Sequence, residues 1–355
     1  MDAYFASPEA VICRSLREVC AGRGPEMVQP ALPPDPVPDF AGSCVRGFAS
    51  SPRRLESRFL YDAEGSALFD EITRQPEYYL TRTEASILAV NAPRIRAAVG
   101  PARILELGSG SAAKTDYLLA AWLERGAACY LPVDVSVAAL DAARRTIAVK
   151  NPVAKVIPIN CQYRECFPLM AQLSPLLVTF LGSSIGNFTE PETVRFLTDL
   201  ALSMRPGDFF LLGIDLVKGR SLLEAAYNDE AGVTARFTRN LFARMNRELG
   251  ACIDLDAIEH TAWYHAAGEQ VEICARFTKD QTFRLTPPGK MITIPQGEVV
   301  KTEISRKFRL ERMVPLLEGC GFATEGVYTD ERRWFALVLL RRRPYYSVPK
   351  TGRRR

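Results

Sequence analysis

The sequence predicts an α/β fold with two domains, one built on a parallel sheet that helices cover on both faces and one of α+β type. Short apolar segments that read as strands alternate with longer amphipathic segments through the middle of the chain, and this alternation is typical of parallel β-α units. A long insert with another pattern interrupts it. The 355 residues, 47% of them hydrophobic, suffice for two domains of ordinary size.

The expected elements follow one another along the chain. Before the alternating region, a helix is predicted over 66–73, a break at Pro76 and a second helix from about 81. Strands are then predicted at "RILELG", "CYLPVDV", "KVIPIN", "LLVTFLG" and "DFFLLGID", and helices over 114–125 and at "SVAALDAARRTIAV" and "PETVRFLTDLALSM". Near the end, "FATEGVYTD" and "RWFALVLLRR" are separated by a short charged turn, which predicts an antiparallel pair that closes the sheet.

Domain boundaries are placed where the composition changes. The first part of the chain contains "VQPALPPDPVPDF", whose prolines favour an extended, flexible segment. The end of the chain is basic, and such charge runs are usually solvated. The predicted parts are 1–45 for the proline-rich extension, 46–82 with 218–306 for the second domain, 83–217 with 307–342 for the sheet domain, and 343–355 for the basic tail.

Charge and cysteine content narrow the class of protein. The 45 basic and 41 acidic residues give a net charge of +4, so nothing in the balance demands a nucleic-acid or membrane partner. Nine cysteines without a C-x-x-C pair argue against a disulfide framework and a structural zinc site. No uncharged segment is long enough to cross a bilayer. We expect a cytoplasmic enzyme with no metal and a small-molecule substrate, and the sequence leaves its oligomeric state open.

A glycine turn follows the first strand of the alternating region, in "ILELGSGSAAKT". Gly108 and Gly110 permit a tight turn and the close approach of a ligand to the backbone, and the N–H groups of the next helix begin there. Because glycine is common in such turns, this stretch alone gives about even odds of a nucleotide-type ligand.

The next strand ends at Asp134, where a carboxylate can accept hydrogen bonds from both hydroxyls of a ribose. The alternative is that Asp134 caps the helix that starts after Ser136. The turn reads E-x-G-x-G, and Ala113 stands where a dinucleotide-binding turn needs its last glycine. The pattern therefore disfavours a nicotinamide cofactor.

The turn and the closing hairpin resemble class I S-adenosylmethionine-dependent methyltransferases, which implies a Rossmann-like sheet domain. In that resemblance, Glu106 and the turn flank the amino acid part of S-adenosyl-L-methionine, and Asp134 holds its ribose. Gln162 and Tyr163, after the third strand, lie by its adenine.

Longer motifs narrow the resemblance. "YDAEGSALFDEIT", "PEYYLTRTE", "LELGSGSAAKT", "VDVS", "FLGSSIGNF", "GIDLVK", "AYND" and "VKTEISRKF" stand in the order seen in the histidine N-alpha-methyltransferases of the ergothioneine pathway. The match runs from about Ser57 to near Leu340. It implies methylation of the α-amine of L-histidine, up to the trimethylated betaine, with no metal.

The resemblance also implies roles for residues on the substrate side. Asn187 and Tyr227 hold the α-carboxylate of the substrate, although alone they would read as a turn residue and a core residue. Glu303 and Ser305 alternate with Ile304, which puts both side chains on one side of an extended segment, and they grip the imidazole. An isolated Glu303 would instead read as solvent-facing.

Four further residues are assigned through the same resemblance. Tyr61 orients the reacting amine and is the predicted catalytic residue, and Tyr78 lies near the cofactor. Lys114 pairs with the carboxylate of the cofactor, and Gly182 leaves room beside it. Alone, a lysine at a helix start would read as solvated, and Gly182 as a turn residue.

The chain departs from the family pattern at three places. Leu80 stands where the family usually has proline, and Gln162 replaces an acidic residue beside the adenine. Ile273 or Cys274 occupies the region of a methionine that covers the imidazole, and we assign Ile273 to the pocket wall. This last departure bears on substrate choice and not on the class of reaction.

Three other functions stay open on the sequence. The first is methylation of another amino acid, such as a tryptophan derivative, which an apolar residue in place of Glu303 would favour. The second is a binding module without catalysis, which the intact carboxylate and imidazole positions disfavour and a turnover assay tests. The third is a nicotinamide-dependent dehydrogenase, which the glycine turn disfavours.

Overall fold

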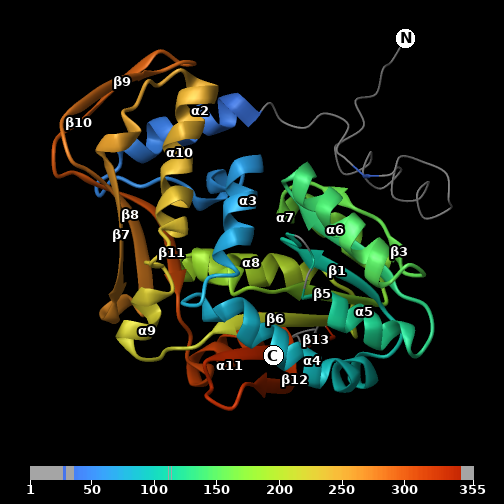
Figure 1. The fold of residues 1–355 in the computed structure, drawn as a ribbon. Helices are drawn as coiled ribbons and strands as arrows, with labels where there is room; N and C mark the ends of the chain where they lie inside the picture. Colours follow the sequence, from blue (N-terminus) through green and yellow to red (C-terminus); the bar gives the residue numbers. More distant parts are fainter. Residues whose placement is uncertain (1–26, 29–35, 111, 113, 345–355) are drawn as a thin grey trace, which may run out of the picture.

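The structure is a computed structural model of the chain and describes residues 27–28, 36–110, 112 and 114–344. Two groups of elements lie side by side (Figure 1): the central sheet with its helices, called the sheet domain below, and the insert with the segment that precedes the sheet, called the second domain. In the part of the chain that is described, no helix is both long enough and apolar enough to span a membrane.

The central sheet has the strand order β12-β13-β6-β5-β1-β2-β3, and β4 also pairs with β2. Neighbours from β6 to β4 run parallel, whereas β13 runs antiparallel to both β6 and β12. The α/β fold class and the closing hairpin are therefore confirmed. The strands are β1 (Arg103–Leu107), β2 (Cys129–Asp134), β3 (Lys155–Val156), β4 (Ile159–Asn160), β5 (Leu176–Phe180), β6 (Phe209–Asp215), β12 (Phe322–Thr329) and β13 (Phe335–Arg342).

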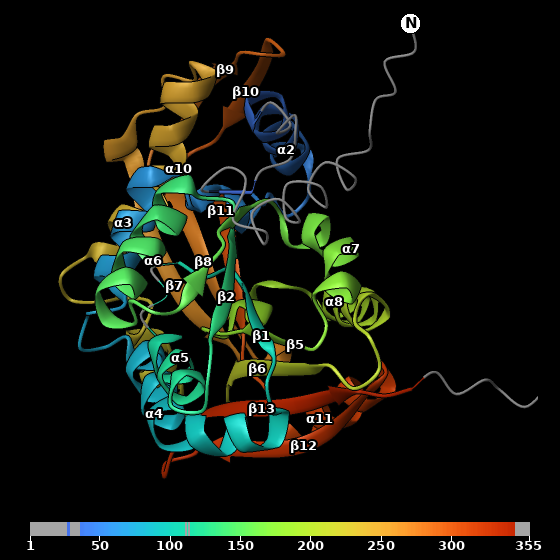
Figure 2. The ribbon, with the colours of Figure 1, turned by 90° about the vertical axis from the view of Figure 1, so that its right-hand side faces the viewer.

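Helices cover both faces of this sheet, which is why its middle strands are continuously apolar. Figure 2 shows the two groups of helices on opposite sides of the strands. The helices of one face are α4 (Tyr79–Val99), α5 (Asp116–Leu123) and α6 (Val137–Lys150), and those of the other are α7 (Tyr163–Leu173), α8 (Glu190–Ser203) and α11 (Leu310–Gly319). The segment "KVIPIN", expected as one strand, forms the short strands β3 and β4.

The second domain holds a sheet with the order β11-β8-β7 and a separate hairpin of β9 and β10. Helix α10 packs along α3 and against β7, and it buries Phe237, Leu241 and Met245. Its elements are α2 (Pro36–Ala49), η1 (Ser57–Leu60), α3 (Ala63–Ile72), α9 (Arg220–Ala225), α10 (Val233–Leu249), η3 (Leu255–Ala257), β7 (Ile258–His265), η4 (Ala266–Gly268), β8 (Gln270–Phe277), β9 (Gln281–Leu285), β10 (Lys290–Ile294) and β11 (Val299–Arg306).

The expected flexible extension ends earlier than residue 45. Helix α2 begins at Pro36 and buries Phe40 and Cys44 in the core of the second domain. Proline is compatible with the first turn of a helix, where the N–H groups have no intrahelical partner. Val28 also pairs with the sheet domain, since its N–H donates to the Pro158 carbonyl at 2.9 Å. The remainder of the extension and the tail from 345 lie outside the described residues.

The two domains meet where β11 crosses the short 3-10 helix η2 (Ser184–Asn187), which follows β5. Just beyond β11, Phe308 forms a parallel bridge with Leu216, the residue after β6. The chain therefore brings the end of the insert directly onto the carboxyl edge of the central sheet. In open α/β sheets that edge is where ligands bind.

Candidate active site

A cleft of about 670 Å³ opens at the carboxyl ends of β1 and β2, between α6 and the second domain. The predicted cofactor residues among its lining are Gly108, Gly110, Asp134, Gln162 and Tyr163. The second domain contributes residues of η1 and α3 to the opposite wall. The cleft is therefore formed by both domains.

The glycine turn has the backbone that glycine allows. Gly108 has a φ of +69°, and a Cβ on it would lie 2.6 Å from the Tyr163 hydroxyl. The Gly110 N–H donates to Asp134 Oδ2 at 3.1 Å, and the Ser136 N–H donates to Asp134 Oδ1 at 2.9 Å. Ser136 is the cap of α6, because its Oγ accepts from the Ala139 N–H. Asp134 is thus not the helix cap and faces the cleft.

Glu106 supports the turn from inside the protein. Its side chain is buried and accepts hydrogen bonds from Thr115 Oγ1 at 2.6 Å and from the Tyr130 hydroxyl. Burial raises the pKa of this carboxyl to about 7, against the opposing effect of these two hydrogen bonds. Glu106 is not among the residues that line the cleft. Its contacts therefore hold Thr115 and Tyr130 in place and do not face a ligand.

Lys114 and Gly182 come together through Glu84, which the sequence did not single out. The buried Glu84 carboxylate forms an ion pair with Lys114 Nζ, and it accepts from the Gly182 N–H at 2.9 Å. A Cβ on Gly182 would lie 3.2 Å from Lys114 Nζ. A Cβ on Gly213 would lie 2.0 Å from Glu84 Oε1, so glycine there makes room for this carboxylate.

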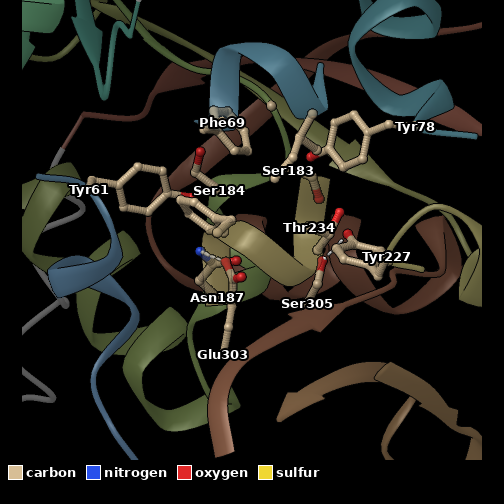
Figure 3. Close-up of a pocket in the computed structure, with 13 residues that line it drawn as sticks. Tyr61, Phe69, Tyr78, Ser183, Ser184, Asn187, Tyr227, Thr234, Glu303 and Ser305 are labelled. Atoms are coloured by element: carbon tan, nitrogen blue, oxygen red, sulfur yellow. Dashed lines mark hydrogen bonds between the residues drawn. The ribbon is translucent and has the colours of Figure 1, made fainter. Parts of the chain in front are cut away.

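A small pocket of about 50 Å³ continues the cleft toward the second domain (Figure 3). The two share Tyr61, Phe69, Ser184 and Asn187 in their walls. The pocket is lined by Tyr61, Phe69, Ile72, Tyr78, Gly182, Ser183, Ser184, Asn187, Tyr227, Thr234, Phe237, Glu303 and Ser305. Five of the six predicted substrate residues, all but Ile273, therefore meet in one pocket.

Glu303 and Asn187 are hydrogen-bonded to each other on one side of this pocket (Figure 3). Asn187 Nδ2 donates to Glu303 Oε1 at 2.9 Å. Burial raises the pKa of the Glu303 carboxyl to about 7, while the Asn187 hydrogen bond and the charge of Lys307 act in the opposite direction. Near neutral pH this group can therefore accept a hydrogen bond as a carboxylate or donate one as an acid.

Tyr227 and Ser305 form the other side. The Tyr227 hydroxyl and Ser305 Oγ are 2.7 Å apart. The Lys307 ammonium lies 2.8 Å from each of these oxygens and 2.9 Å from Asp215 Oδ2. The sequence analysis did not single out Lys307 or Asp215. An Arg-Lys pair after a strand gives no sign that the lysine is buried.

Aromatic rings close the pocket. Tyr61 packs edge to face against Phe69 and Phe237 at centroid distances of 5.5 and 5.4 Å, and Tyr78 packs similarly on Tyr227 at 6.1 Å. Burial raises the pKa of the Tyr61 and Tyr78 hydroxyls well above its usual value, so both stay protonated. Such walls keep water away from a group bound in the pocket.

Four sequence-based placements differ from the geometry. Tyr78 and Gly182, both assigned to the cofactor, line the small pocket with the substrate residues and not the large cleft. Ile273 lies opposite Glu303 in the sheet register but is buried and lines neither pocket, because the strand packs it into the core. Lys114 also lines neither, since Glu84 holds it. Within the described residues, no group of His, Cys, Asp and Glu is arranged to hold a metal.

Comparison with known proteins gives the same family over nearly the whole chain. The family model described as histidine-specific methyltransferase, SAM-dependent, matches residues 40–342. The histidine N-alpha-methyltransferase of Mycolicibacterium smegmatis is 40% identical over 82% of this chain and 92% of its own length. The enzyme of the same name from Mycobacterium tuberculosis is 38% identical with the same coverage.

More distant matches follow. Ergothioneine biosynthesis protein 1 of Neurospora crassa is 32% identical over 56% of this chain and 23% of its own length. A solved methyltransferase from Clostridium acetobutylicum matches 79% of this chain and 98% of its own length, with a TM-score of 0.43 and 10% identity. From the family match and the mycobacterial relatives, the chain belongs to the histidine-specific, S-adenosylmethionine-dependent methyltransferases.

Proposed function

We propose that this enzyme methylates the α-amine of L-histidine with S-adenosyl-L-methionine, in three successive transfers that give the trimethylated betaine hercynine, a step of ergothioneine biosynthesis. One observation carries the proposal. Glu303 and Ser305 lie on one strand and face the same pocket as Asn187 and Tyr227, in a chain of this family. Histidine offers its two ring nitrogens to Glu303 and Ser305. Its α-carboxylate is the partner for Asn187 and Tyr227.

The large cleft fits the methyl donor. Gly108 lets a ligand approach the backbone, and Asp134 presents a carboxylate at the end of β2 for the ribose hydroxyls. Gln162 and Tyr163 stand at the adenine end. A neutral amide in Gln162 can accept from the adenine amine, although less strongly than a carboxylate. Lys114 and Gly182 are proposed at the amino acid part of the donor, beside Glu84.

The small pocket fits the amino acid. The Tyr227 hydroxyl and the second N–H of Asn187 Nδ2 can donate to the α-carboxylate, because the first N–H is held by Glu303. Glu303 and Ser305 then meet the two ring nitrogens. Both hydrogen-bonding sides of the pocket are preformed by contacts within the protein, which lowers the ordering cost of binding.

Methyl transfer from a sulfonium to an amine is an in-line displacement, in which the nitrogen lone pair forms the new bond and the sulfur takes the electron pair of the old one. The protein must hold a neutral amine at about 3 Å from the methyl carbon and exclude water. Tyr61 and Tyr78, whose rings wall the pocket, are proposed to orient the amine through their hydroxyls. Before each transfer the substrate ammonium loses one proton to become the neutral amine, and after the third transfer the nitrogen carries no hydrogen and keeps a positive charge.

We place the enzyme in the cytoplasm, acting on free histidine, without a nucleic-acid or membrane partner. Supporting this, the cysteines that the structure describes are thiols. Thiols persist in a reducing compartment.

The decisive experiment is to incubate the purified full chain with S-adenosylmethionine and each of the twenty amino acids, and to read the products by mass. We expect histidine to gain one, two and finally three methyl groups. Among weaker relatives, a 4-dimethylallyltryptophan N-methyltransferase of Epichloe festucae is 22% identical. Methylation of tryptophan and not of histidine would therefore refute the assigned substrate while keeping the reaction class.

A further inference from the structure

A buried ammonium lies directly behind the substrate pocket. Lys307 Nζ contacts Asp215 Oδ2 at 2.9 Å, the Tyr227 hydroxyl at 2.8 Å and Ser305 Oγ at 2.8 Å. The side chains of Lys307 and Asp215 are both 0% exposed. An ammonium has three hydrogens and no lone pair, so all three are used and none remains for a substrate.

This arrangement restricts the two hydroxyl groups of the pocket. Both oxygens accept a hydrogen bond from Lys307, and the 2.7 Å contact between Tyr227 and Ser305 takes the hydrogen of one of them. Each hydroxyl has a single hydrogen. The pair therefore keeps one O–H for a ligand, either that of Tyr227 or that of Ser305, but not both at once.

We propose that Lys307 is a positioning residue for substrate binding, which holds Ser305 as a hydrogen-bond acceptor and leaves the Tyr227 hydroxyl as the donor to the substrate carboxylate. The proposal rests on the proposed function. A phenol is a better donor than an aliphatic hydroxyl, and a hydrogen bond to a carboxylate is charge-assisted and stronger than a neutral one. In the opposite arrangement, the carboxylate would face a lone pair of the Tyr227 oxygen.

The arrangement also defines what the ring must offer. Ser305 gives its hydrogen to Tyr227, so the imidazole nitrogen that meets Ser305 must carry a hydrogen. The other ring nitrogen then shares one proton with Glu303, either as a ring N–H that donates to the carboxylate or as a carboxylic acid that donates to the ring. Lys307 thereby connects recognition of the carboxylate to recognition of the ring.

A neighbouring lysine provides a matched control. Lys218 Nζ also contacts Asp215, at 2.5 Å from Oδ1, and is nearly buried, but its other partners are the Tyr79 hydroxyl and the Leu216 carbonyl. Lys218→Met and Lys307→Met each remove one ammonium from the same carboxylate. Only the second removes the contacts to Tyr227 and Ser305.

The test measures histidine binding by calorimetry in the presence of S-adenosylhomocysteine. Lys307→Met should raise the histidine dissociation constant by about tenfold or more, about the size of one weakened hydrogen bond to a charged group, because Tyr227 and Ser305 are no longer held in place. It should leave S-adenosylhomocysteine binding within about twofold. Lys218→Met should change histidine binding by less than about threefold. If Lys307→Met does not fold, Lys307→Met with Asp215→Asn, which removes both charges of the pair, replaces it.

A double-mutant cycle separates this role from a general loss of structure. In a Tyr227→Phe, Ser305→Ala background, Lys307→Met should weaken histidine binding by less than about threefold, because the groups it positions are gone. Two results would overturn the proposal for Lys307 but not the proposed function. One is that Lys307→Met weakens histidine binding equally in both backgrounds, and the other is that Lys218→Met weakens it as much as Lys307→Met does. Failure of the wild-type protein to bind histidine overturns the proposed function and this inference with it.

Discussion

Replacing Glu303 by glutamine should stabilise the substrate-free protein at neutral pH and leave its stability unchanged at acid pH. Burial raises the pKa of this carboxyl from 4.5 to about 7, so the folded protein holds the proton more tightly than the unfolded chain does. When the folded pKa is raised, the contribution of the group to folding stability is complete below the unfolded pKa. For Glu303 that contribution is lost as the pH rises from about 4.5 through about 7. Glutamine stays neutral and can keep the hydrogen bond from Asn187.

The size of this stability difference follows from the unfolded and folded pKa values of Glu303. Each pKa unit corresponds to about 1.4 kcal/mol, so a rise from 4.5 to about 7 makes the ionised Glu303 cost up to about 3 kcal/mol of folding free energy. Glu303→Gln should match wild type near pH 4.5 and exceed it by about 2–3 kcal/mol at pH 8. Glu106 titrates in both proteins, and its contribution cancels in the difference.

Urea unfolding at pH 5, 6, 7 and 8 without histidine measures this difference. Glu272→Gln on β8 is a control of opposite sign: burial raises the Glu272 pKa, but its hydrogen bonds to Lys301 and Gln270 outweigh burial and lower it. A lowered folded pKa contributes stability that is complete above the unfolded value of 4.5 and is lost only at lower pH. That variant should therefore be less stable than wild type by a nearly constant amount from pH 6 to 8. A difference for Glu303→Gln that is flat from pH 5 to 8 would refute the assignment of a buried carboxyl with a raised pKa.

Four further outcomes follow from the site. Asp134→Ala should weaken S-adenosylmethionine binding by about 1–3 kcal/mol in calorimetry, and an unchanged dissociation constant would reduce Asp134 to a support for the glycine turn. Glu303→Ala should cost about 2–4 kcal/mol in kcat/KM for histidine and less for tryptophan, whereas equal losses would contradict its role as ring partner. Gly108→Ala should weaken cofactor binding, because the new Cβ would lie 2.6 Å from the Tyr163 hydroxyl, and Tyr163→Phe should restore part of it. Deleting residues 1–26 should leave the unfolding temperature unchanged, but deleting 1–40 should lower it through loss of the buried Phe40; equal temperatures would show that α2 is dispensable.

Local signals predicted most of the sheet domain. Three features depend only on a few consecutive residues and are present in the structure. They are the alternation of apolar strands and amphipathic helices, the glycine turn, and Asp134 at the end of its strand. Helices α7 and α11 were missed, and each contains a proline, Pro168 and Pro315. Proline inside a helical pattern normally ends it, and the packing of these helices on the sheet outweighs that local preference.

The charged residues of the site show the limit of sequence reasoning. Glu84, Asp215 and Lys307 are fully buried, yet a charged residue in a sequence is most often exposed. Their burial depends on partners that are far apart along the chain: Glu84 pairs with Lys114, and Asp215 with Lys307. No local pattern encodes such pairs, whereas the resemblance to a family pointed to residues that line the small pocket.

The same contacts that shape the pocket also hold the two domains together. Asp215 ends β6 of the sheet domain, whereas Tyr227 and Ser305 belong to the insert and Lys307 follows β11. Removing one partner of a buried ion pair leaves an uncompensated charge, which costs several kcal/mol. The network therefore joins the insert to the edge of the sheet, and the same contacts fix the hydroxyls of Tyr227 and Ser305 beside each other in the pocket.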